Sequence, residues 1–138
     1  MRHARRWMML GFALALGAAG CSGQPGPASL APSAEPGVLR TEVTPALTGL
    51  LLLETFPVQV QLLVEGELPN PCSRLGWYVK PGDDQGRIEV ALYADELAET
   101  ACIQVVAPYS EVIPIGAFER GSFGIFLNGE LVEEFALP

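Results

Sequence analysis

Cysteine and histidine have the most specific chemistry in this chain, and both are scarce. The 138 residues include three cysteines, Cys21, Cys72 and Cys102, and one histidine, His3. His3 lies in a basic N-terminal segment typical of an export signal, so a processed chain would contain no histidine. Without an imidazole, Ser-His and Cys-His nucleophiles are excluded, and a metal site would need further ligands. We therefore expect no catalytic residue, no metal and no cofactor.

The N-terminus carries the features of an export signal that ends at a cysteine. Three arginines precede an apolar stretch at 7–19, which is shorter than the roughly 20 helical residues that span a bilayer core. The small residues Ala18-Ala19-Gly20 then lead to Cys21, an order that resembles the lipobox of bacterial lipoproteins. The resemblance implies that 1–20 is a signal peptide and that Cys21 is acylated and anchored to a bacterial membrane, facing the periplasm or the exterior. The alternative is an ordinary secretory signal with an incidental cysteine.

Residues 22–37 have the composition of a linker. Proline, glycine, serine and alanine occupy 13 of these 16 positions. Proline-rich chains favour extended conformations of about 3 Å per residue and act as spacers. We therefore predict a lipidated cysteine and linker at 21–37, followed by one folded domain at 38–138.

The processed chain is strongly acidic. Beyond the signal, five Lys and Arg residues face 16 Asp and Glu residues, a net formal charge of −11. Such a chain repels phosphate groups, so nucleic-acid binding is excluded. Anionic lipid would also repel it, so we expect membrane attachment to depend on acyl chains.

Alternating apolar and polar residues predict strands along the domain. The clearest runs are 58–65 and 88–95, in which every second residue is apolar. A third run at 123–127 leads through Asn128-Gly129 to 131–137, and this dipeptide indicates a two-residue hairpin because both positions accept positive φ. We expect the turn to act through its backbone, so that Asn128→Gly costs little stability.

Shorter apolar segments complete the predicted fold. Weaker strand candidates lie at 48–54, 75–79, 103–107 and 111–115, and 94–101 could supply a helical turn. Pro114 cannot donate a ladder hydrogen bond, which places its strand at a sheet edge or a bulge. Seven to eight short strands separated by turns predict an all-β fold, an antiparallel β-sandwich.

The C-terminal half also resembles immunoglobulin-like domains of bacterial secreted proteins and lipoproteins. The resemblance extends from Cys72 to Phe135 and is carried by Pro71-Cys72, Ala101-Cys102 and Gly121-Ser122-Phe123. It implies an immunoglobulin-like sandwich and implies no activity.

Cys72 and Cys102 remain when Cys21 is assigned to lipid. Thiols of exported proteins are usually oxidised in pairs, so we predict a disulfide between them. A redox centre is one alternative, although it usually has the spacing Cys-x-x-Cys, which is absent. A metal site is the other, and it would need two more ligands.

Two local features could bind a ligand. Asp83 and Asp84 lie in a glycine-bounded loop and could offer oxygens to Ca²⁺, but an acidic hairpin turn between strands explains them better. Trp77 and Tyr78 could stack on a sugar ring. Neighbouring strand residues point to opposite faces, so we expect Trp77 in the core near the disulfide and Tyr78 partly exposed.

These observations favour a non-catalytic, lipid-anchored protein of the cell envelope that displays an interaction or structural domain. An exposed edge strand could receive an envelope protein by β-augmentation. The alternative is a solute-binding module for Ca²⁺ or carbohydrate.

Overall fold

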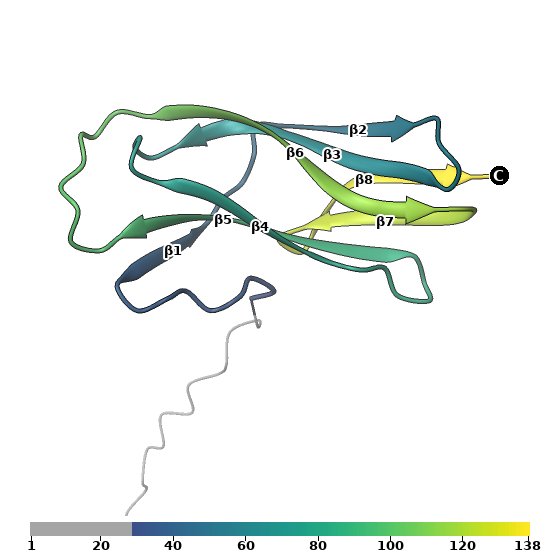
Figure 1. Ribbon diagram of the computed structural model, residues 1–138, viewed down its shortest axis with the longest axis horizontal. Coiled ribbons are helices and arrows are strands. Elements are labelled where there is room, and N and C mark those ends of the chain that lie inside the picture. Colours follow the sequence, from purple (N-terminus) through teal and green to yellow (C-terminus); the bar gives the residue numbers. More distant parts are fainter. Residues whose placement is uncertain (1–28) are drawn as a thin grey trace, which may run out of the picture.

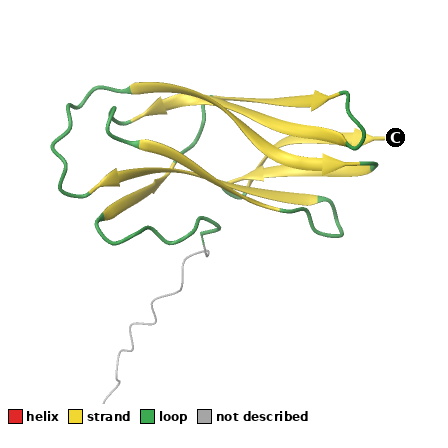
Figure 2. Cartoon of the chain, viewed as in Figure 1, coloured by secondary structure: helices red, strands yellow, loops and turns green. Residues whose placement is uncertain are grey.

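The computed structural model describes residues 29–138, so the predicted signal peptide and Cys21 lie outside the described residues. Eight strands form two layers that pack face to face (Figure 1), and Figure 2 shows strands and loops without a helix in this range. The strands are β1 (Val38–Glu42), β2 (Leu47–Leu53), β3 (Val58–Leu68), β4 (Arg74–Lys80), β5 (Arg87–Leu97), β6 (Ala107–Phe118), β7 (Gly121–Leu127) and β8 (Glu130–Leu137). Within 29–138, therefore, no helix is long and apolar enough to cross a membrane. The predicted all-β sandwich is confirmed.

β5 is the central strand of the larger, five-stranded sheet. β4 pairs along one edge of β5, and β1 and β7 pair end to end along the other edge, with β8 beyond β7. The smaller sheet has the order β2-β3-β6. Every pairing is antiparallel except β5–β7, which is parallel.

The core lies between the sheets and is formed by the alternating residues that the sequence indicated. The inward positions of β3 and β5 are almost completely buried: Val60, Leu62, Val64, Ile88, Val90 and Leu92. Burying an aliphatic side chain of this size contributes about 1.5–3 kcal/mol. Near the opposite end from the disulfide, Phe123 stacks on Phe135 and contacts Phe118, with ring centroids 5.0 and 4.6 Å away. These two strands and the aromatic cluster hold the layers together.

Two segments differ from the prediction. The strand predicted at 103–107 is wrong, because residues 98–106 form the connection that crosses from β5 in the larger sheet to β6 in the smaller one. The helical turn considered for 94–101 is also wrong. β5 continues to Leu97, and Ala94 opposes Thr41 of β1 and Leu75 of β4. Strand pairing on both edges therefore overrides the local sequence preference.

The predicted position of Pro114 is confirmed on both counts. β6 pairs with β3 alone and forms an edge of the smaller sheet. Gln61 opposes Pro114 while Val60 opposes Gly116, so one residue of β6 is left over at a bulge. Proline has no N–H to donate to a ladder. On an edge strand this gap can face away from the neighbouring strand, so no acceptor in the ladder is left unpaired.

The hairpin at Asn128-Gly129 is confirmed, with φ of 50° at Asn128 and 88° at Gly129. The expectation that the Asn128 side chain is dispensable is wrong. Its Oδ1 accepts a hydrogen bond from Leu92 N at 2.8 Å, and its Nδ2 donates to Val43 O at 2.9 Å and to Leu92 O at 3.1 Å. β7 and β1 pair with the same edge of β5 but leave a stretch between them where no strand residue pairs with β5. The side-chain amide of Asn128 takes the place of a backbone peptide group there.

The described part of the predicted linker, residues 29–37, contains no strand but contacts the domain. Pro32 O accepts a hydrogen bond from Arg40 Nη1, and Gly37 O accepts one from Ala98 N at 2.9 Å. These residues therefore lie along the sandwich, beside β1 and the end of β5.

Candidate functional site

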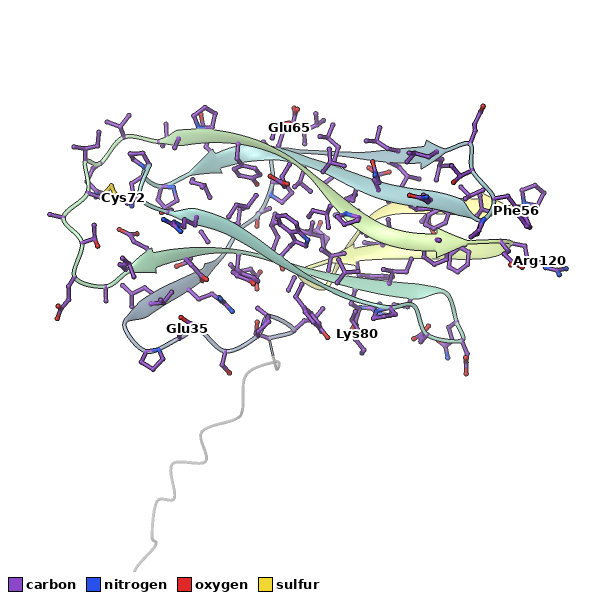
Figure 3. The ribbon with its side chains drawn as sticks, viewed as in Figure 1. Glu35, Phe56, Glu65, Cys72, Lys80 and Arg120 are labelled. Carbon is purple, nitrogen blue, oxygen red and sulfur yellow. A yellow bond between two sulfur atoms is a disulfide. The ribbon has the colours of Figure 1, made fainter. Side chains whose placement is uncertain are left out.

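A disulfide joins Cys72 and Cys102 at one end of the sandwich, and Figure 3 shows Phe56 and Arg120 at the other end. The Cα atoms of the two cysteines are 6.1 Å apart. Cys72 lies between β3 and β4, and Cys102 lies between β5 and β6. Both connections cross from one sheet to the other, so the bond links the two crossings at this end.

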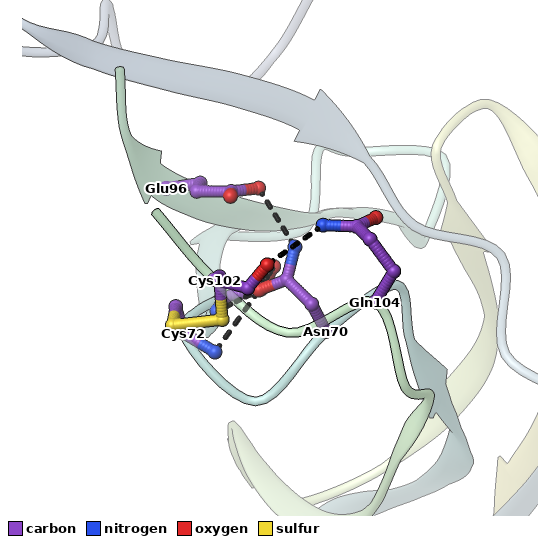
Figure 4. Close-up of a disulfide and its surroundings, with 6 residues drawn as sticks. Asn70, Cys72, Glu96, Cys102 and Gln104 are labelled. Carbon is purple, nitrogen blue, oxygen red and sulfur yellow. Dashed lines mark hydrogen bonds between the residues drawn. A yellow bond between two sulfur atoms is a disulfide. The ribbon is translucent and has the colours of Figure 1, made fainter. Parts of the chain in front are cut away.

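Asn70 anchors the connection that carries Cys72, and it is almost completely buried (Figure 4). Its Oδ1 accepts hydrogen bonds from the backbone N–H groups of Cys72 and Ser73, both at 3.0 Å. Its Nδ2 donates to Glu96 Oε2 of β5 at 3.1 Å. Asn70 was not predicted from the sequence, although asparagine between two prolines is a signal for a turn in which the side chain bonds the backbone.

The connection carrying Cys102 exposes a short apolar segment. Ile103 is 69% exposed, Val105 58% and Val106 57%. The segment bends on itself, because Val105 N donates to Ile103 O at 3.1 Å and Gln104 Nε2 donates to Cys102 O at 3.2 Å. Three exposed aliphatic side chains within four residues make this segment a candidate for protein binding.

A cleft of about 510 Å³ lies beside the disulfide. Its walls combine apolar and charged residues: Val38, Pro71, Cys72, Arg74, Asp95, Glu96, Leu97 and Thr100. Both of its carboxylates already have partners. Asp95 accepts two hydrogen bonds from Arg40, at 2.7 and 2.6 Å, which hold its pKa below the usual value. Glu96 accepts a hydrogen bond from Asn70 through its Oε2.

Asp83 and Asp84 lie in the hairpin loop between β4 and β5. Asp83 Oδ1 accepts hydrogen bonds from Gln85 N at 2.9 Å and Arg87 N at 3.0 Å, and these bonds lower the pKa of Asp83, that from Arg87 most. The carboxylate therefore closes the turn. Asp84 is exposed, and within residues 29–138 no three acidic, cysteine or histidine side chains converge as metal ligands would.

Comparison with protein families identifies the domain. The family model described as the ORF11 beta-sandwich domain matches residues 62–137, which is more than half of the chain. The chain belongs to this family. The match begins inside β3 and ends with β8, so it includes both disulfide cysteines and leaves out β1 and β2. No curated protein and no solved structure match the chain.

Trp77 and Tyr78 also lie within the matched ORF11 beta-sandwich region, on β4. Trp77 packs against the core and opposes Leu92, whereas Tyr78 is 42% exposed on the outer face. The structure therefore separates the two rings by the thickness of the strand. They do not form a joint platform for a sugar.

Proposed function

We propose that this member of the ORF11 beta-sandwich family is a lipid-anchored, non-catalytic protein of the cell envelope that binds another protein. Three features support the proposal. Cys21 follows a short apolar segment and small residues, as an acylated cysteine would. The disulfide fits an oxidising compartment. The third feature is the exposed apolar segment beside it.

That apolar segment, Ile103 to Val106, carries the binding part of the proposal. Ordering a loop before binding reduces the conformational entropy lost in the complex. The bond from Cys102 to Cys72 supplies this order from one side. Uncharged aliphatic groups also allow an acidic domain to bind without requiring a basic partner.

The anchor is tested by replacing its cysteine. Wild-type chain expressed in a bacterium should sediment with membranes, and Cys21→Ser should not, because two or more acyl chains hold a protein stably on a bilayer. Ser22→Ala is the matched control and should behave as wild type. The intact mass of the mature wild-type chain should exceed that of the bare polypeptide by the acyl groups. A mass equal to the bare polypeptide would exclude lipidation.

The binding surface is tested by photo-crosslinking in intact cells. A photoreactive residue at Gln104, between the exposed Ile103 and Val105, should give an adduct with a second protein. The same residue at Arg120, at the other end of the sandwich (Figure 3), should give none. Mass spectrometry of the adduct identifies the partner. Absence of any adduct at 104, or equal adducts at both positions, would contradict a binding site at the disulfide end.

A further inference from the structure

β2 is an edge strand with an unusual sequence, Leu-Thr-Gly-Leu-Leu-Leu-Leu. It pairs with β3 along one edge and lies at the end of the smaller sheet (Figure 1). Exposed edges present unpaired N–H and C=O groups that can bind another strand. Proteins usually protect such edges with charged side chains, prolines or bulges.

The other edge strands of the described domain carry this protection. β1 contains Arg40, β4 contains Lys80, and β6 contains Pro114 at a bulge. β8 contains Glu133, whose Oε1 accepts a hydrogen bond from Thr48 Oγ1 at 3.0 Å. Among the strands in residues 29–138, β2 is the edge strand with neither a charged residue nor a proline.

Leucine side chains of β2 are exposed on both faces. Leu47, Leu51 and Leu53 lie on the outer face of the sheet. Across the ladder, Gln61 opposes Leu51 and Gln59 opposes Leu53. Leu52 lies on the inner face, opposite the buried Val60, yet it is 46% exposed. The larger sheet therefore does not cover this end of β2.

We propose that β2 binds β2 of a second copy, antiparallel, so that the two smaller sheets form one continuous six-stranded sheet. Full overlap of the seven residues places the two-fold axis at Leu50. Leu50 then opposes Leu50 of the second copy, Leu47 opposes Leu53, and Gly49 opposes Leu51. A closed, two-fold contact of this kind is the commonest form of homo-oligomer.

Charge selects a second copy over a charged peptide. β2 itself has no charged residue, and the Glu133 carboxylate of β8 that contacts it already accepts a hydrogen bond from Thr48, so an uncharged apolar strand fits it best. Two copies whose residues 21–138 each carry a net formal charge of −11 repel one another, and a strand without charge is the place where that repulsion costs least. In the proposed register Glu54 opposes Ala46, so no like charges face each other across the pair.

A single cysteine tests both the contact and its register. In Leu50→Cys, the two introduced thiols face each other with Cα atoms about 4.5–5.5 Å apart, which permits a disulfide. The full chain in cells should then run as a dimer on a non-reducing gel. Leu52→Cys is the matched control, because its cysteine would oppose Thr48 and should give little dimer.

A charge placed in the interface provides a second control pair. Leu51→Lys should reduce the Leu50→Cys dimer band at least about tenfold, since each lysine would be brought into an apolar contact. Val112→Lys should leave the band unchanged, because Val112 is equally exposed, 40% against 41%, but lies on β6. The same results are expected with Cys21→Ser, so failure of the lipid anchor and failure of the β2 contact are separable. Absence of the Leu50→Cys dimer, or equal loss with both lysines, would overturn the proposal.

Discussion

Gly86→Ala is expected to lower the free energy of unfolding by about 4 kcal/mol, through backbone strain and overpacking together. Gly86 has a φ of 75°, which an L-residue adopts only at a cost. A β-carbon at this position would also overlap the carbonyl oxygen of Ser122 on β7. Because that oxygen belongs to the backbone, the overlap can be relieved only by moving a strand.

Gly129→Ala is the matched control for this experiment. Gly129 also has a positive φ, 88°, but no atom lies within 4 Å of the position that its β-carbon would take. Gly129→Ala should therefore lower the free energy of unfolding only by the backbone strain, about 1–2 kcal/mol. Chemical denaturation of both variants measures the difference. Equal losses would mean that the contact between Gly86 and Ser122 does not constrain the domain.

The large effect is expected because Gly86 lies where the parallel pairing begins. Its carbonyl oxygen accepts a hydrogen bond from Gly124 N at 2.9 Å, one residue before Arg87 opposes Gly124. An alanine here would push β7 away from the start of β5. The substitution would thus weaken the one parallel contact of the larger sheet and the hairpin that depends on it.

Local patterns predicted the long strands and the last hairpin. Leu62 and Leu92 lie in runs where every second residue is apolar, and both are completely buried. Pro114 indicated an edge or a bulge because its chemistry forbids a ladder hydrogen bond in any context. These signals are carried by residues close together in sequence, so they can be recognised without knowledge of the topology.

Long-range pairings could not be predicted in this way. β1 is five residues long, and its Arg40 opposes Asp95, far along the chain. The parallel pairing of β5 with β7 likewise depends on the path of the chain through both sheets. Sequence alone does not show that two short strands share one edge of β5.

The disulfide end was predictable in part. Counting cysteines led to the pair Cys72 and Cys102, because export and the assignment of Cys21 left no other partners. The buried amide of Asn70 was not predicted, because its hydrogen bond to Glu96 of β5 joins residues that are far apart in the sequence. The exposure of Ile103 was missed for the opposite reason. Its apolar neighbours resembled a strand, and only the crossing between sheets excludes them from the core.

Asn128→Gly is expected to lower the free energy of unfolding by about 3 kcal/mol, although glycine accepts the same backbone angles. The variant loses three hydrogen bonds of the side-chain amide and leaves Leu92 N–H without its partner. The gap between β7 and β1 on the edge of β5 would then be open to water. Chemical denaturation at neutral pH measures the loss.

Asn128→Asp separates the side chain from the turn. Aspartate keeps the shape and the acceptor for Leu92 N, but its second oxygen would face the carbonyl oxygens of Val43 and Leu92. At neutral pH we therefore expect a loss at least as large as that of Asn128→Gly. The two carbonyl oxygens should raise the pKa of this carboxyl in the folded state, so stability returns as the pH falls through that pKa and the protonated group donates again. If the turn alone mattered, both variants would unfold at nearly the wild-type denaturant concentration at every pH.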